Sequence, residues 1–153
     1  MKIVDYLDES LIISDLDCDD KDSVLKKLAD LIHQRFPNLS EVEVYNVLQE
    51  REELGSTGIG EGIAIPHGKI KKLDTIVAAF ARSRKGVNFD AIDDQPVYFF
   101  FLLLAPENSA GLHLKALAKI SRMLKSQHFR EQLTAAKDEK ELFEIIKADD
   151  DRL

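Results

Sequence analysis

The chain has 153 residues, of which 44% are hydrophobic and 32% charged, and its formal net charge is −7. This composition is typical of a folded domain with a sizeable core, so we expect residues 1–153 to form one domain. The acidic balance argues against sequence-independent nucleic-acid binding, and a single cysteine, Cys18, excludes an intrachain disulfide.

No membrane span and no export signal are expected. No apolar run reaches the roughly 18 residues that a span needs. The N-terminal segment is acidic and lacks the apolar core of a signal peptide, so we expect a cytoplasmic protein.

The acidity lies at the two ends of the sequence. Residues 1–22 carry −6 and residues 138–153 carry −4, whereas residues 23–137 carry +3. Within this middle portion, residues 66–86 hold six basic side chains against the single acid Asp74. Such a run is most often only a solvated face.

The first part of the chain predicts a short strand and then a helix. Leu11–Ile13 is an apolar strand candidate. From Val24 to Phe36 apolar residues recur three and four positions apart, as on one face of a helix, and Pro37 stops this helix.

A second helix is predicted, with Arg51 near its end. Ser40 and Glu43 form a Ser-x-x-Glu capping box, and Val47 and Leu48 give the helix an apolar face. Arg51 lies at the edge of that face and is expected to point toward the loop that follows. Two interpretations fit it: a fixed charge that grips phosphate oxygens, or a cation favoured by the helix C-terminus.

Residues 54–70 hold five of the seven glycines and cannot be helical. Glycines allow positive φ and close approach of backbone N–H groups to an anion. The phosphate-loop pattern fails because five residues separate Gly62 from Gly68 and Ile70 follows Lys69 where Ser or Thr is needed. The dinucleotide fingerprint fails as well, so a nucleotide phosphate is not the expected ligand.

His67 lies between Pro66 and Gly68, directly after the apolar residues Ile63–Ile65. Proline biases the residue before it toward extended backbone, so the chain is expected to leave a strand and present the imidazole rigidly. With an ordinary pKa of about 6.5, the ring is mostly neutral near pH 7 and its lone pair can attack phosphorus. The alternative is a surface-loop histidine without a chemical role.

The second half of the chain alternates strand and helix patterns. The predicted elements are strands at Thr75–Ala81 and Val97–Ala105, a turn region at Arg84–Asp94, a helix capped by Asn108 or Ser109, and helices at Gln127–Ala135 and Lys140–Ile146. The run at 97–105 is almost wholly apolar, as in a strand buried on both faces. The order predicts an α/β sandwich, with a central mixed sheet flanked by helices on both faces.

His113 lies in the first turn of the helix after residues 97–105, on its apolar stripe. In open α/β sheets, ligands bind beyond the carboxyl ends of strands. A second imidazole there can hydrogen-bond a phosphoryl group or His67; the alternative is a satisfied core histidine. His33 and His128 are expected to be structural.

Metal and serine chemistry are not expected. HExxH and CxxC are absent, Cys18 has no ligand partner nearby, and no cofactor is implied. Gly-x-Ser-x-Gly is absent too, and Ser56 has no local base.

The segments Arg51–Gly60 and Ile63–Lys69 resemble the enzyme IIA domain of the mannitol/fructose class of the bacterial phosphoenolpyruvate-dependent phosphotransferase system. The resemblance extends over nearly the whole chain. It implies a phosphohistidine carrier, in which the histidine matching His67 accepts a phosphoryl group on Nε2 from an HPr-like phosphocarrier protein. It also implies that the histidine matching His113 steadies this group and that the arginine matching Arg51 holds its negative charge.

Residues Phe89–Val97 are most similar to the free-standing nitrogen-regulatory branch of this family. In that branch the phosphorylation state governs binding to partners such as potassium transporters and sensor kinases. The chain ends soon after the IIA fold, so no fused phosphocarrier, IIB or membrane IIC domain is expected. The basic run at 66–86 and apolar surface near the site are expected to meet the acidic-faced phosphoryl donor.

Other hypotheses stay open. A free-standing sugar-specific (fructose or mannitol) enzyme IIA would pass its phosphoryl group to a cysteine of a IIB component. A non-catalytic module would sense a small anion without turnover. A metal hydrolase would require bound metal.

Overall fold

The computed structural model describes all residues from 1 to 153. Its helical elements are η1 (Ile3–Asp5), η2 (Glu9–Leu11), α1 (Lys21–Arg35), α2 (Glu41–Glu53), α3 (Ala110–Lys125), α4 (Gln127–Ala135) and α5 (Glu139–Arg152). Its strands are β1 (Ile12–Ile13), β2 (Gly58–Gly60), β3 (Ile63–Ala64), β4 (His67–Lys69), β5 (Val77–Val87) and β6 (Val97–Ala105).

The strands form one mixed sheet with β6 at its centre. The order is β1-β5-β6-β3-β2, and β4 also pairs with β6. β6 is antiparallel to β5 and parallel to β3 and β4. All of β6 is buried except Tyr98, as the apolar run at 97–105 predicts for a strand covered on both faces.

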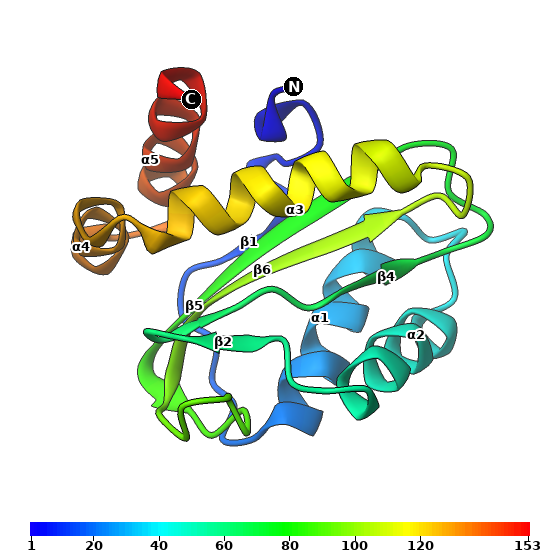
Figure 1. Ribbon diagram of the computed structural model, residues 1–153, viewed down its shortest axis with the longest axis horizontal. Coiled ribbons are helices and arrows are strands. Elements are labelled where there is room, and N and C mark those ends of the chain that lie inside the picture. Colours follow the sequence, from blue (N-terminus) through cyan, green and yellow to red (C-terminus); the bar gives the residue numbers. More distant parts are fainter.

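Helices cover both faces of this sheet. The pair α1 and α2 packs together on one side, where α1 contacts β5 and α2 contacts β4, while α3 crosses β6 on the other side (Figure 1). The helices α4 and α5 extend from the end of α3, and α5 also packs against β1. The buried apolar residues form one cluster of 44. The predicted α/β sandwich is confirmed.

Local capping signals place most helix starts as predicted, but the predicted end of the last helix at Ile146 is wrong, because α5 continues to Arg152. The Ser40 side chain accepts a hydrogen bond from the backbone N–H of Glu43 and so caps α2. Ser109 is the N-cap residue of α3, but its hydroxyl donates to the carbonyl of Pro106 over 2.7 Å instead of capping the helix.

β5 is longer than predicted. The strand runs on to Val87 through the segment expected to start a turn at Arg84, with an irregular register after Arg82. These polar residues stay in the strand because distant elements satisfy their side chains. Arg82, for example, donates hydrogen bonds to the carbonyls of Leu133 and Ala136 at the end of α4.

The two ends of the chain meet at α5. The backbone N–H of Val4 donates to the buried carboxylate of Asp150 over 3.1 Å, and Lys119 of α3 pairs with the same carboxylate at 2.6 Å. No helix combines the length and the apolar character needed to span a bilayer.

Candidate functional site

His67 stands where the chain passes from β3 to β4. Both short strands run parallel to β6, and His67 pairs with Leu103 as the first residue of β4. His67 therefore follows the end of a strand, β3, as expected, and it also begins the next strand. Pro66 interrupts the pairing because it has no N–H, yet its carbonyl still accepts from Leu103, so the chain resumes pairing at once.

The backbone fixes which nitrogen of His67 carries the proton. Nδ1 lies 2.8 Å from the carbonyl oxygen of Ile65. Because a carbonyl oxygen can only accept, Nδ1 is the protonated nitrogen of the neutral ring. Nε2 therefore keeps its lone pair and is the atom available for attack on an electrophile.

Arg51 reaches this lone pair from the last turn of α2. Its Nε donates to Nε2 of His67 over 3.3 Å, and its Nη1 donates to the carbonyl of Gly55 over 2.9 Å. The side chain thus points toward the following loop, as its position at the edge of the apolar face predicted. A fixed guanidinium lies beside the free nitrogen.

His113 lies against His67 from the first turn of α3. The ring centroids are 5.5 Å apart and the rings meet edge to face at 65°. His113 is only 7% exposed, and its Nδ1 is buried without a hydrogen-bond partner. In a histidine with a purely structural role, a buried Nδ1 would have a hydrogen-bond partner. The Nδ1 of His113 is therefore free to bond a group that enters the site.

Burial keeps both imidazoles neutral. It lowers the pKa of His67 below its ordinary value; the hydrogen bond to Ile65 opposes this effect, the charge of Arg51 lowers the pKa further, and the carboxylate of Glu52 raises it. Burial also lowers the pKa of His113, and repulsion from the protonated form of His67 and from Lys69 lowers it further. Both rings are consequently uncharged near pH 7.

A small hollow of about 180 Å³ opens beside the imidazole. Its walls are Arg51, Ser56, Thr57, Ile59, Ile65, His67, Leu117 and Ser121. A larger hollow of about 450 Å³ lies near the start of α1, where five carboxylates line it: Asp20, Asp22, Glu52, Glu53 and Asp90. Those carboxylates would repel an anion, so the smaller hollow is the candidate site.

Close packing explains two glycines of the segment 54–70. A side chain at Gly68 would collide with Cγ1 of Val47 on α2, and one at Gly58 would lie 2.8 Å from Cβ of Ala91. These two glycines therefore let neighbouring segments approach, a role different from the anion contacts that the sequence suggested. Gly68 brings α2, and hence Arg51, close to β4.

The basic run at 66–86 does not form one surface. Arg82 is 2% exposed and bonded to carbonyls, while Lys85 pairs with Asp17 and Asp19 at 2.9 and 2.8 Å. Arg82 and Lys85 lie on β5 and are already engaged within the chain, so they do not add to a basic surface beside β4. Three exposed lysines remain after His67, at positions 69, 71 and 72.

Sequence reasoning missed Glu52. This carboxylate is 8% exposed and accepts hydrogen bonds from both the backbone and the hydroxyl of Thr57. One signal was present in the sequence: Val44, Leu48 and Glu52 recur every four residues along the buried face of α2. An acid in that position must find partners.

A family model described as "Phosphoenolpyruvate-dependent sugar phosphotransferase system, EIIA 2" matches residues 5–149. This chain belongs to that family. The resemblance inferred from the residues is confirmed, and the EIIA 2 domain is thereby a component of a phosphotransferase system.

This EIIA 2 domain is similar to three named proteins. It is 39% identical over 146 residues to a nitrogen regulatory protein of Bradyrhizobium diazoefficiens, covering 95% of each chain. It is 33% identical over 151 residues to the fructose-specific EIIABC component of Bacillus subtilis, covering 98% of this chain and 24% of that protein. The crystal structure of nitrogen regulatory protein IIA-Ntr from Neisseria meningitidis matches with a TM-score of 0.88 and 36% identity, covering 94% of this chain and 98% of the other.

Proposed function

We propose that this EIIA 2 domain is a phosphohistidine carrier. His67 accepts a phosphoryl group on Nε2 from the phosphohistidine of an HPr-like phosphocarrier. The observation that carries this proposal is the bond between Nδ1 and the carbonyl of Ile65, which leaves Nε2 as the nucleophile. Residues 1–153 act as a single enzyme IIA domain in the cytoplasm.

The transfer balances without a proton acceptor at Nε2. The P–N bond of the donor breaks and its electron pair returns to the donor imidazole, while the Nε2 lone pair forms the new P–N bond. The proton on Nδ1 stays in place, held by Ile65. The protein then needs mainly to align the two rings and to stabilise the charge on the phosphoryl oxygens.

Arg51 and His113 supply that stabilisation. The guanidinium already reaches Nε2, so a phosphoryl group there would find its N–H donors within a short movement. His113 lies edge-on to His67 and has a nitrogen without a partner. Lys69, close enough to affect the pKa of His113, adds positive charge to the same region.

The donor docks on an exposed apolar rim around the site. Leu54, three residues after Arg51, is 85% exposed, and Leu114, next to His113, is 66% exposed. Ile59 on the wall of the hollow is also partly exposed. Large exposed apolar side chains next to a reactive centre favour a transient protein contact.

We infer that the output is regulatory. Similarity over 95% of each chain to a nitrogen regulatory protein supports this branch, with phosphorylation state governing binding to a protein target such as a transporter or sensor kinase. The alternative is a sugar-specific enzyme IIA that passes phosphate to a IIB component, supported by the fructose-specific relative. Phosphoryl transfer from the labelled domain to a purified fructose IIB would favour this alternative.

The deciding experiment is intact mass after incubation with phosphoenolpyruvate, enzyme I and phosphocarrier. We expect a gain of one phosphoryl group, acid-labile and base-stable, in the natural protein and in the control variant His128→Ala, whose residue is exposed on α4. His67→Ala should gain none. Normal labelling of His67→Ala would remove the assigned nucleophile, and phosphate binding without any mass change would support the anion-sensing module.

A further inference from the structure

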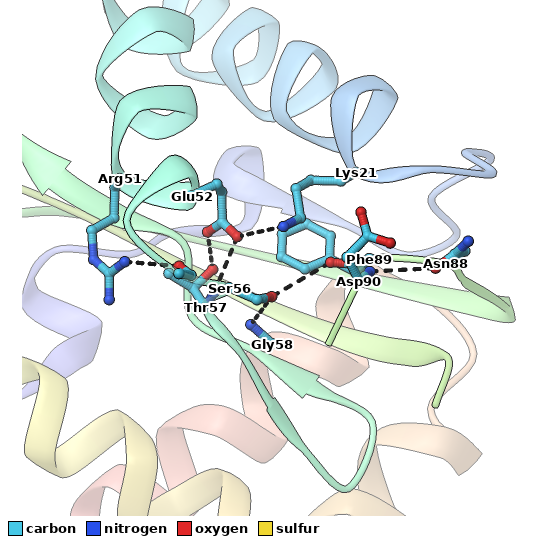
Figure 2. Close-up of polar contacts among 10 residues, drawn as sticks. Lys21, Arg51, Glu52, Ser56, Thr57, Gly58, Asn88, Phe89 and Asp90 are labelled. Atoms are coloured by element: carbon cyan, nitrogen blue, oxygen red, sulfur yellow. Dashed lines mark hydrogen bonds and ion pairs between the residues drawn. The ribbon is translucent and has the colours of Figure 1, made fainter. Parts of the chain in front are cut away.

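Glu52 and Thr57 form a buried polar cluster beside Arg51 (Figure 2). Oε1 of Glu52 accepts the backbone N–H of Thr57 over 3.0 Å, and Oε2 accepts its hydroxyl. Both residues are almost fully buried. Thr57 is therefore fixed at two points by one carboxylate.

Lys21 neutralises this carboxylate from another helix. Its Nζ lies 3.1 Å from Oε1 of Glu52 and stacks 5.1 Å above the ring of Phe89. A cation in the first turn of α1 is disfavoured by the helix dipole, so its presence there is explained by this ion pair. The cluster joins α1, α2 and the loop after α2, as the dashed contacts in Figure 2 show.

A chain of backbone contacts leads from this cluster to the reactive ring. The carbonyl of Thr57 accepts the N–H of Ile65 over 3.0 Å. The carbonyl of Ile65 lies 2.8 Å from Nδ1 of His67. Ile65, whose carbonyl selects the tautomer of His67, is thus held through its own N–H by Thr57, which Glu52 holds in turn.

We propose that Glu52 is a positioning residue for phosphoryl acceptance, acting through Thr57 and Ile65 to keep the proton of His67 on Nδ1. It does not touch the reacting atoms. This inference rests on the proposed carrier function, because only a nucleophilic Nε2 gives the tautomer a kinetic consequence. Loss of the carboxylate frees Thr57, loosens residue Ile65 on both of its backbone bonds and lets the proton shift to Nε2.

A purely architectural role for Glu52 makes a different prediction. If the carboxylate only stabilised the loop, its removal would lower the free energy of unfolding without changing the ring of His67 in the molecules that remain folded. The tautomer must therefore be measured directly, apart from stability and apart from the donor proteins.

The test uses histidine ¹⁵N chemical shifts of the unphosphorylated full chain, together with phosphorylation kinetics. We expect one tautomer, with the proton on Nδ1, in the natural protein and a mixture in Glu52→Ala. The kcat for acceptance should fall about tenfold in this variant, whereas KM for the phosphocarrier should stay within about twofold. Glu52→Gln keeps an acceptor for the N–H of Thr57. It should therefore restore most of the single-tautomer spectrum and most of the kcat.

Glu53→Ala is the matched control. Glu53 is the exposed neighbour of Glu52 and accepts only from Gln49, so its removal should change neither tautomer nor kcat. If Glu52→Ala does not fold, Thr57→Val is measured in its place. This variant keeps the side-chain volume but lacks the hydroxyl. It should also give mixed tautomers.

The outcomes separate this inference from the proposed function. Folded Glu52→Ala, or Thr57→Val in its place, with a single Nδ1–H tautomer and unchanged kcat would overturn the positioning role. Failure of the natural protein to accept a phosphoryl group would overturn the proposed function. The ¹⁵N spectra would then still show whether Glu52 sets the tautomer of His67.

Discussion

Nε of Arg51 donates to Nε2 of His67 over 3.3 Å, so the guanidinium occupies the lone pair that the phosphoryl group must use. The same side chain is tethered to the carbonyl of Gly55 through Nη1. Phosphorylation therefore has to replace one hydrogen bond of Arg51, while the tether keeps the charge within reach of the incoming oxygens.

Arg51→Lys should slow phosphorylation with little loss of stability. Lysine keeps the charge but cannot hold Gly55 and the phosphoryl oxygens together. A charge-assisted hydrogen bond is worth about 1.5–3 kcal/mol, so the rate should fall roughly tenfold to a hundredfold. Stopped-flow or quenched-flow transfer from the phosphocarrier measures this, with Arg122→Lys on the exposed side of α3 as control.

Acceptance by His67 should persist below neutral pH. Its pKa is lowered by burial and by Arg51, so Nε2 stays unprotonated at pH values where an ordinary histidine, with a pKa of about 6.5, is half charged. A proton NMR titration of the ring should give a midpoint below 6.5, and Arg51→Met should move it upward. A midpoint at or above 6.5 in the natural protein would contradict this account.

The same shifts link stability to pH. The unfolded chain protonates His67 and His113 at a higher pH than the folded protein does. Their contribution to the free energy of unfolding is thus fully present above a pH of about 6.5 and is lost as the pH falls through the folded-state pKa values. Urea unfolding between pH 7.5 and 5.5 should show this decline, and His67→Gln should reduce it.

His113→Ala should shorten the lifetime of the phosphoryl adduct. The ring is buried beside His67 with an unpartnered nitrogen, so its removal both opens the site to water and deletes a donor. We expect dephosphorylation to accelerate by about tenfold, with partial recovery in His113→Gln, which keeps an N–H donor. Decay of the phosphorylated mass with time measures this; equal lifetimes would exclude a role for His113 in holding the group.

Gly68→Ala should separate α2 from β4. A methyl group at this position collides with Cγ1 of Val47. Overpacking of this kind costs about 1–3 kcal/mol of stability, and Arg51 on α2 should move away from His67. Gly111→Ala is the control, because a methyl group there meets nothing within 4 Å. Thermal unfolding and the phosphorylation rate of both variants test the packing role.

Arg82→Ala should destabilise the fold from outside the site. Arg82 donates to the carbonyls of Ser14, Leu133 and Ala136, which join β5 to α4 and to the segment after β1. The carbonyls of Ser14 and Leu133 lose this donor, whereas that of Ala136 still accepts from Arg84. Each buried acceptor left without a partner costs about 1–3 kcal/mol. Lys85→Ala, which removes two exposed ion pairs of β5, should change stability far less. Both variants should still accept a phosphoryl group when folded.

Much of the fold follows from local patterns. The run Val97–Ala105 coincides with β6, because a strand buried on both faces needs apolar side chains at successive positions. Ser40 starts α2 and Pro37 follows the end of α1, since capping and the missing N–H of proline act over a few residues. The bounds of β5 were harder to predict, because its polar end is held by carbonyls of α4 that lie far away in sequence.

The sequence by itself determined the family, the α/β sandwich and the identity of His67, His113 and Arg51 as candidates, because periodicity, glycine content and the Pro-His-Gly motif are local properties. Only the tertiary structure decided that these three side chains meet, that His67 carries its proton on Nδ1, and that Glu52 binds Thr57 in the loop after α2. A tautomer and a contact between α2, β4 and α3 depend on atoms from separate parts of the chain, and no local pattern encodes their distances.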